Sequence, residues 1–285
     1  MKTLQLIQLY CTVCDYYDTT LGALYQRFSN NSCPKFKDEE VVTTYLFGVA
    51  EGNCTVKSIY QFIKNYWADW FPNMPSYQQF THRIAMLSDV FVALSGLAIN
   101  GKSPLDGIEH VMDSLPIIVA GEKRSGSAKT ANGLCNKGYC SSKGMYYYGV
   151  KLHILAQSKG GTLPAPRIAE LTPAAVNDLT AAKEYLHGAK NMVIYADKIY
   201  LDAQWQAELA RQNIELKIPR KKRKGDTLKG GDCISTAVSR VRQPVEAFFA
   251  WLIEKTGIQS ASKVRSIPGL ISFVFARLAA VFLCV

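Results

Sequence analysis

Three carboxylates stand in sequence settings that suit chemistry. Asp113 lies within the apolar run HVMDSLPIIV, Asp197 ends the apolar run NMVIYAD, and Glu246 borders the apolar stripe of VRQPVEAFFAWLIEK. A carboxylate in such a run is paired, lies at the end of an element or holds a cation. A single one would more often be a helix cap or a surface charge. Three in one basic region predict a site for hard divalent ions, Mg²⁺ or Mn²⁺, which take oxygen ligands.

A site of three carboxylates suits reactions at a phosphate backbone. Two divalent ions can activate an attacking oxygen and stabilise the leaving oxygen in an in-line displacement at a phosphodiester. The four histidines, by contrast, show no ligand spacing to one another. The residue types therefore favour nucleotidyl chemistry with two metal ions.

The charge distribution supports a polyanionic partner. The 285 residues include 33 Lys and Arg against 23 Asp and Glu, a net charge of +10. Residues 1–100 hold seven basic and eight acidic residues, so the whole excess lies in residues 101–285 with the three carboxylates. Such an excess indicates nucleic acid or an anionic membrane surface.

A basic run precedes the segment that carries Glu246. Six of the eight residues from Lys217 to Lys224 are basic, and phosphate contact is favoured over a merely solvated loop. The backbone must be held against the acidic site, so further DNA contacts are predicted near the carboxylates. The predicted contacts are Lys143, Lys151, Lys198, Tyr200, Arg220, Lys221, Lys222, Arg223, Lys224 and Arg242.

The elements that must position these residues differ along the chain. Residues 1–100 read as helices separated by turns, with Asp38, Thr55 or Ser58, and Ser76 as candidate N-caps. One long helix is expected over residues 77–94. This helical N-terminal domain is expected to be a helix-turn-helix DNA reader, a dimerisation unit or a plain bundle.

Residues 106–285 form the second predicted domain, of class α/β. Strands are expected over 107–120, 145–158, 162–171, 191–197 and 214–219, and helices over 177–189, 203–213, 232–255 and the apolar C-terminal stretch. Three successive strands followed by alternating helices and strands predict a mixed sheet flanked by helices. Pro244 predicts that the helix carrying Glu246 starts there or bends.

Composition also bears on the compartment. The N-terminus lacks a continuous apolar signal segment, and a chain this large does not need its eight cysteines as disulfides, so a cytoplasmic protein is expected. Residues 272–285 are apolar but too short for a membrane span and contain Arg277, which predicts a buried helix. The Cys11/Cys14 and Cys135/Cys140 pairs are weak candidates for zinc.

Five segments in order resemble insertion-sequence transposases of the DDE class. They are DSLPI at Asp113, GYCSSKGMYYYGVKLH from Gly138, ELTPAAVND from Glu170, YADKIY around Asp197 and RQPVE from Arg242 to Glu246. The spacing is similar too, with 84 residues from Asp113 to Asp197 and 49 more to Glu246. KDEEVVTTYLFGVA and FPNMPSYQQFTHRI resemble the family's N-terminal region.

The resemblance implies a ribonuclease-H-like core in which Asp113, Asp197 and Glu246 bind two Mg²⁺ or Mn²⁺ ions. It implies cleavage at the ends of the element and attack of the freed 3′-hydroxyl on target DNA, without a covalent enzyme intermediate. The implied partners are double-stranded DNA, as terminal inverted repeats and target, and a second copy of the chain in a paired-end complex, with no membrane involved.

Departures from the family pattern keep two alternatives open. Ser239 and Ile253 stand where many relatives have Tyr and a basic residue, and Asn177 stands where a histidine is expected. A non-catalytic DNA-binding protein on the same fold, or another ribonuclease-H-like nuclease, would carry the same carboxylates.

Overall fold

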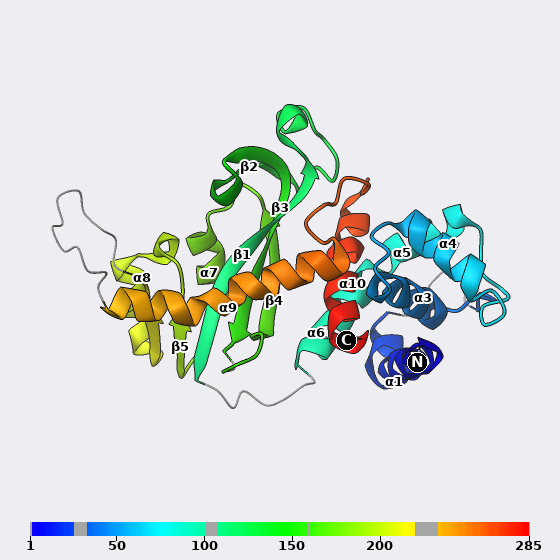
Figure 1. Ribbon diagram of the computed structural model, residues 1–285, viewed down its shortest axis with the longest axis horizontal. Helices are drawn as coiled ribbons and strands as arrows, with labels where there is room; N and C mark the ends of the chain where they lie inside the picture. Colours follow the sequence, from blue (N-terminus) through cyan, green and yellow to red (C-terminus); the bar gives the residue numbers. More distant parts are fainter. Residues whose placement is uncertain (1, 26–32, 101–107, 159, 220–232, 285) are drawn as a thin grey trace. The chain divides into compact units, whose positions relative to one another are not determined.

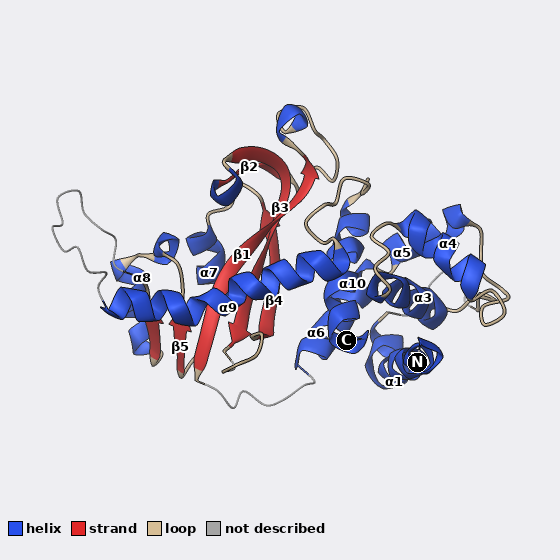
Figure 2. Cartoon of the chain, viewed as in Figure 1, coloured by secondary structure: helices blue, strands red, loops and turns tan. Residues whose placement is uncertain are grey.

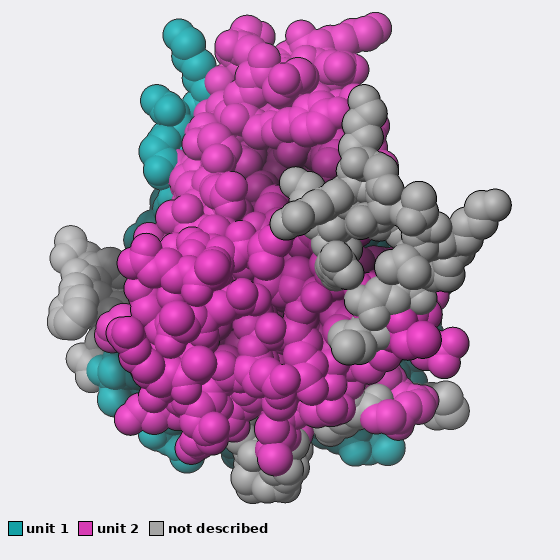
Figure 3. All heavy atoms as spheres, turned by 90° about the vertical axis from the view of Figure 1, so that its left-hand side faces the viewer, with its two compact units in different colours: residues 1–101, 129–133, 252–285 teal, residues 102–128, 134–251 magenta. Residues whose placement is uncertain are grey.

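The computed structural model describes all residues except 1, 26–32, 101–107, 159, 220–232 and 285. Backbone contacts divide the chain into two compact units, which Figure 3 colours separately. Unit 1 comprises residues 1–101, 129–133 and 252–285, and unit 2 comprises residues 102–128 and 134–251. The division predicted from sequence differs for residues 252–285, because the apolar C-terminal helix packs with the N-terminal helices.

Unit 1 is helical (Figures 1 and 2). The sequence predicted one long helix over residues 77–94. The structure has two helices there, α5 and α6, which meet at a bend of 62°. The remaining predicted helices form close to their expected positions. The helices are α1 (Lys2–Tyr16) with a π-helical turn (Tyr17–Leu21), α2 (Gly22–Leu24), α3 (Asp38–Ala50), α4 (Val56–Tyr66), α5 (Tyr77–Met86), α6 (Ser88–Asn100) and α10 (Ile267–Cys284).

The terminal helix α10 is long and apolar enough to cross a membrane by length and composition, but 61% of that stretch is buried within the protein. Arg277 at its centre is fully buried. Its guanidinium donates hydrogen bonds to the carbonyl oxygens of Thr256 at 3.0 Å, Phe273 at 2.9 Å and Cys54 at 2.7 Å. The predicted buried helix is therefore present, and backbone carbonyls satisfy its one charged side chain.

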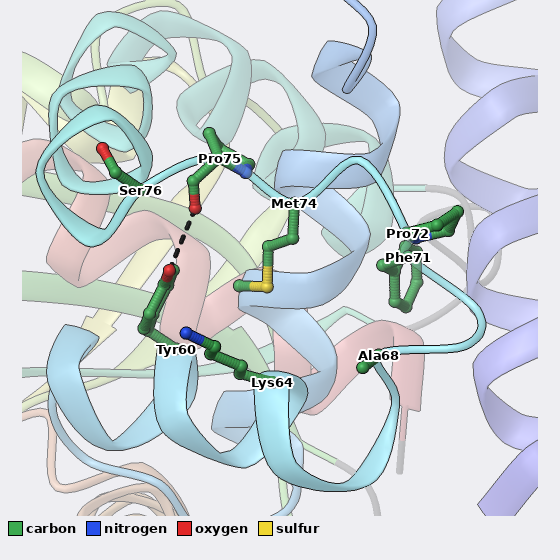
Figure 4. Close-up of a pocket in the computed structure, with 8 residues that line it drawn as sticks. All are labelled: Tyr60, Lys64, Ala68, Phe71, Pro72, Met74, Pro75 and Ser76. Carbon is green, nitrogen blue, oxygen red and sulfur yellow. Dashed lines mark hydrogen bonds between the residues drawn. The ribbon is translucent and has the colours of Figure 1, made fainter.

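The connection between α4 and α5 encloses a cavity of about 320 Å³, shown in Figure 4. The Tyr60 hydroxyl donates a hydrogen bond to the Pro75 carbonyl at 3.0 Å and so links the connection to α4, and Lys64 lines the same cavity.

Arg83 on α5 is buried, and its guanidinium pairs with Asp38 at the start of α3. Arg83 is thus a structural residue of the helical unit.

Unit 2 is built on a mixed sheet of six strands. Along the sheet the order is β2-β3-β1-β5-β6, and β4 also pairs with β3. The pairs β1–β3, β2–β3 and β3–β4 are antiparallel, whereas β1–β5 and β5–β6 are parallel. The strands are β1 (Glu109–Ala120), β2 (Asn136–Cys140), β3 (Met145–Gln157), β4 (Ala165–Pro173), β5 (Met192–Tyr195) and β6 (Ile214–Lys217).

Close packing of β1 against β3 depends on Gly149. A Cβ atom at this position would lie 2.0 Å from the carbonyl oxygen of Ile117, so only glycine allows the strands to pair there. The register of this pair then shifts between Ile118 and Ala120. Strand β2, which pairs with the first part of β3, is the one strand of the sheet that the sequence patterns did not predict.

Helices cover both faces of the sheet. Met112 and Leu155 on one face pack in a core with Ala182 of α7 and Trp205 of α8. Helix α9 crosses in front of the strands in Figure 1, and its Arg242 reaches Asp113 of β1. These helices are α7 (Asp178–Tyr185), α8 (Ala203–Arg211) and α9 (Cys233–Thr256), the last of which continues into unit 1 after Trp251.

Candidate active site

Asp113 and Asp197 lie level with each other on neighbouring parallel strands. In the β1–β5 pair, Val111 stands opposite Tyr195, so the two aspartates each follow the last paired residue by two positions. Side chains two residues apart share a face of a sheet. The two carboxylates, 84 residues apart in sequence, are therefore brought to the same face of the sheet, Asp113 within β1 and Asp197 just after the end of β5.

Helix α9 adds Arg242 and Glu246 to this face. Arg242 Nη1 lies 2.8 Å from Asp113 Oδ2, and Arg242 Nη2 lies 2.6 Å from Glu246 Oε1. The helix continues through Pro244, so Arg242 and Glu246 keep the i,i+4 spacing at which side chains meet. The helix therefore does not start at Pro244, and one guanidinium joins two of the three predicted carboxylates.

Burial dominates the electrostatics of Asp113. The pKa of this carboxyl is raised to about 6, chiefly by burial and to a smaller extent by the negative charges of Asp197 and Asp178. The Ser114 amide, which donates to Asp113 Oδ1 at 2.8 Å, and the Arg242 guanidinium lower the pKa. The carboxyl is thus costly to ionise unless a cation lies beside it, which is Arg242 in this conformation.

Asp178 is a fourth carboxylate near the site, and the sequence patterns missed it. Its Oδ1 accepts a hydrogen bond at 2.8 Å from Lys151 Nζ, which also donates to the Val176 carbonyl at 2.9 Å. Asn177, the expected histidine position, caps α7 by accepting from the Leu179 amide. In the sequence, the only signal for Asp178 was its position just after a helix N-cap. An acidic residue there indicates a favourable interaction with the helix dipole and does not indicate a functional site.

A buried polar group lies on the α7 side of the sheet. Nε2 of the fully buried His153 lies 2.8 Å from Thr172 Oγ1. The other ring nitrogen of His153, Nδ1, has no hydrogen-bond partner within the protein. The buried hydroxyls of Tyr147, Tyr185 and Tyr200 lack protein partners too. Tyr200, predicted as a DNA contact, is completely buried in the core and faces protein rather than solvent.

The predicted DNA contacts other than Tyr200 divide into three groups. Lys143, in the turn between β2 and β3, and Lys198, directly after Asp197, are exposed, and Arg242 is partly exposed. Lys151 is largely buried in its ion pair with Asp178, so its charge is already matched within the protein. The remaining five, Arg220, Lys221, Lys222, Arg223 and Lys224, lie outside the described residues.

The donor types around Asp113 fit a hard divalent ion, because all three predicted ligands are carboxylates. In the described part of the chain, however, no three His, Cys, Asp or Glu side chains are grouped closely enough to enclose an ion. The guanidinium of Arg242 takes the position of a cation between Asp113 and Glu246.

All eight cysteines, including the Cys11/Cys14 and Cys135/Cys140 pairs, are free thiols.

Comparison with protein families agrees with this geometry. A family model described as a transposase DDE domain matches residues 102–262, a segment that contains all three carboxylates. The chain belongs to this transposase family. No curated protein sequence matches the transposase. The family match confirms the resemblance identified from the five sequence segments, and the transposase has the mixed sheet and flanking helices expected from them.

Proposed function

We propose that this transposase cleaves DNA at the ends of an insertion sequence and joins the freed 3′-hydroxyl to target DNA, in a reaction that depends on divalent metal ions. The observation that carries the proposal is the placement of Asp113 and Asp197 at the same level of adjacent parallel strands, with Glu246 joined to Asp113 through Arg242. Asp197 follows the carboxyl end of β5, the position at which α/β sheets usually bind ligands.

The topology supports a ribonuclease-H-like catalytic core. Three antiparallel strands, β4, β3 and β1, lie beside two parallel strands, β5 and β6, with helices on both faces. In such a core the first carboxylate lies on the first strand, the second follows the fourth long strand and the third lies on a later helix. Asp113 lies on β1 and Glu246 on α9, whereas Asp197 follows β5, the fifth strand, because the additional short strand β2 precedes β3.

Asp113, Asp197 and Glu246 would hold two Mg²⁺ or Mn²⁺ ions. When bound, such ions promote loss of a proton from the attacking hydroxyl and stabilise charge on the leaving oxygen. The protein orients its own ligands. The Ser114 amide fixes one oxygen of Asp113, and the strand register keeps Asp113 beside Asp197.

Double-stranded DNA is the proposed substrate, as terminal inverted repeats and as target, bound by two copies of the chain in the cytoplasm. The basic excess of residues 101–285 supports phosphate contacts by Lys143, Lys198, Arg242 and the segment 220–224. We do not extend this surface to Lys151 and Tyr200, because one is paired and the other buried. Lys57 and Lys64 are exposed on α4 and are the candidate contacts of the helical unit.

The test is cleavage and joining of a labelled oligonucleotide that carries the element's own terminal sequence. We expect Asp113→Asn, Asp197→Asn and Glu246→Gln each to slow Mg²⁺-dependent cleavage at least about a hundredfold, because each removes a proposed ligand of the ions that stabilise charge on the leaving oxygen, while DNA binding persists. Glu254→Gln, at an exposed position of the same helix, is the control and should cut at the wild-type rate.

Any other result of this experiment would indicate a different function. Cleavage without joining would identify a nuclease, and DNA binding without cleavage in Mg²⁺ or Mn²⁺ would identify a non-catalytic binding protein. The second alternative has an observation in its favour, since Ser239 and Ile253 replace the Tyr and basic residue of many relatives. A triad variant that cuts at the wild-type rate would remove that residue from the proposed site.

A further inference from the structure

Arg242 uses the oxygen atoms that a metal ion would need. One arm of its guanidinium bonds Asp113 Oδ2 and the other bonds Glu246 Oε1. The second oxygen of Asp113, Oδ1, accepts the Ser114 amide. Both oxygens of Asp113 are therefore engaged, and Arg242 keeps only 17% of its side-chain surface exposed.

A guanidinium and a divalent ion compete for these carboxylates. Mg²⁺ sits about 2.0–2.1 Å from its oxygen ligands and demands near-octahedral geometry, whereas a guanidinium nitrogen needs about 2.8 Å. Two cations held between the same carboxylates also repel each other. Arg242 in its bridging position therefore weakens metal binding at Asp113 and Glu246, and its departure from either carboxylate favours it.

A DNA phosphate offers Arg242 an alternative partner of the same geometry. Guanidinium forms paired hydrogen bonds to phosphate as it does to carboxylate, and the side chain is long enough to swing between neighbouring anions. Arg242 reaches the site from the exposed side, because Glu246, its partner on α9, keeps 57% of its side-chain surface exposed. A backbone phosphate that approaches this face would meet Arg242 next to the carboxylates.

We propose that Arg242 acts as a gate that couples DNA binding to metal loading. Without DNA it bridges Asp113 and Glu246 and holds the site closed to divalent ions, and a phosphate draws it away and frees both carboxylates. The inference rests on the proposed function, because it takes these carboxylates as the metal ligands. It assigns Arg242 a positioning role distinct from simple DNA affinity.

The test measures Mn²⁺ binding by electron paramagnetic resonance in the full chain, without DNA and without turnover. Arg242→Gln is expected to bind Mn²⁺ about tenfold more tightly than the wild type, a coupling of ordinary allosteric size. Arg242→Lys, which keeps the charge but cannot bridge two carboxylates with a planar fork, should lie between them. Arg240→Gln, exposed on the same helix, is the matched control for the loss of one positive charge and should match the wild type.

A short double-stranded DNA oligonucleotide is then added, with its own Mn²⁺ binding subtracted. The gate requires that DNA tighten Mn²⁺ binding about tenfold in the wild type and in Arg240→Gln, and much less in Arg242→Gln. If Arg242→Gln and Arg242→Lys bind Mn²⁺ no more tightly than Arg240→Gln, the gate is wrong. Equal tightening by DNA in all variants would overturn it as well.

Two further variants separate this inference from the proposed function. Asp113→Asn and Glu246→Gln should each weaken Mn²⁺ binding in the Arg242→Gln background if the carboxylates are the ligands. Unchanged binding in both would show that the proposed metal site is wrong. Weakened binding combined with no effect of Arg242→Gln would reject the gate alone. Circular dichroism of each variant checks that the chain is folded.

Discussion

At the scale of single residues, burial decides which groups respond to pH. His153 is fully buried between β1 and β4, and its Nε2 lies 2.8 Å from the Thr172 hydroxyl. Burial lowers the pKa of its imidazole to about 4, with Lys151 acting in the same direction and Asp178 opposing it. The folded protein therefore keeps His153 neutral at pH values where the unfolded chain binds a proton.

This shift predicts a pH dependence of stability. Between about pH 6.5 and pH 4 the unfolded state binds more protons than the folded state, so the free energy of unfolding falls as the pH is lowered, by up to about 3 kcal/mol. His153→Gln should remove this part of the dependence. Urea unfolding between pH 7.5 and pH 5 measures it, and His82→Gln, at an exposed site on α5, is the control. An equal loss of stability in all three proteins would contradict the assignment.

At the scale of elements, the ion pair of Lys151 and Asp178 joins β3 to the first turn of α7. Both side chains are at most 15% exposed, so each charged group has lost most of its hydration and is stabilised by the opposite charge instead. The pair also lies within electrostatic reach of Asp113, whose pKa Asp178 raises. It therefore belongs to the support of the site, on the opposite side of the sheet from Arg242.

Removing one partner of this pair should destabilise the protein. Asp178→Asn leaves the Lys151 ammonium without its counter-charge in a largely buried position, at a cost of about 2–3 kcal/mol in the free energy of unfolding. Lys151→Met combined with Asp178→Asn should recover part of that loss. Urea unfolding is the measurement.

A more exposed pair on neighbouring elements provides the comparison. Lys183 and Asp202 are 2.8 Å apart, with 41% and 26% of their side-chain surfaces exposed. Lys183→Met should therefore cost less than about 1 kcal/mol. If Asp178→Asn costs no more than Lys183→Met, the Lys151 pair does not support the fold in the way proposed.

At the scale of the whole molecule, the distribution of charge sets the expected affinity for DNA. Residues 1–100 are nearly neutral, whereas the excess of basic residues lies in the remainder, which contains the carboxylates. Phosphate contacts release counterions, so the logarithm of the DNA-binding constant falls with the logarithm of the salt concentration by about 0.9 per contact. The salt slope thus counts phosphate contacts.

Neutralising the basic segment should lower that slope. A triple change of Lys221, Lys222 and Lys224 to Gln is expected to reduce it by up to about 2.7, since about 0.9 is lost per phosphate contact. The measurement is fluorescence anisotropy of labelled duplex DNA over a series of salt concentrations. The same triple change at Lys2, Lys35 and Lys37, in the nearly neutral region and outside the proposed DNA contacts, is the control and should change the slope by less than about one. Equal slopes for both variants would place the main DNA contact elsewhere.

The sequence alone determined the three carboxylates as candidates for the active site and the class of fold around them. Asp113 and Asp197 could be selected because a charge in or at the end of an apolar run is expensive to bury. The periodicity of apolar residues predicted most helices and strands, and the order of five segments identified the family that the match over residues 102–262 confirms. These features are local, so each can be read from consecutive residues.

Only the tertiary structure decided which charges meet and which remain in solvent. Lys151 lies within a predicted strand and Lys198 directly after one, yet Lys151 is paired with Asp178 and Lys198 is exposed. Asp113 and Arg242, which pair in the bridge to Glu246, are 129 positions apart, and α10 packs against helices from the start of the chain. The free energy of a charge depends on its neighbours in space, and residue spacing along the chain does not specify those neighbours.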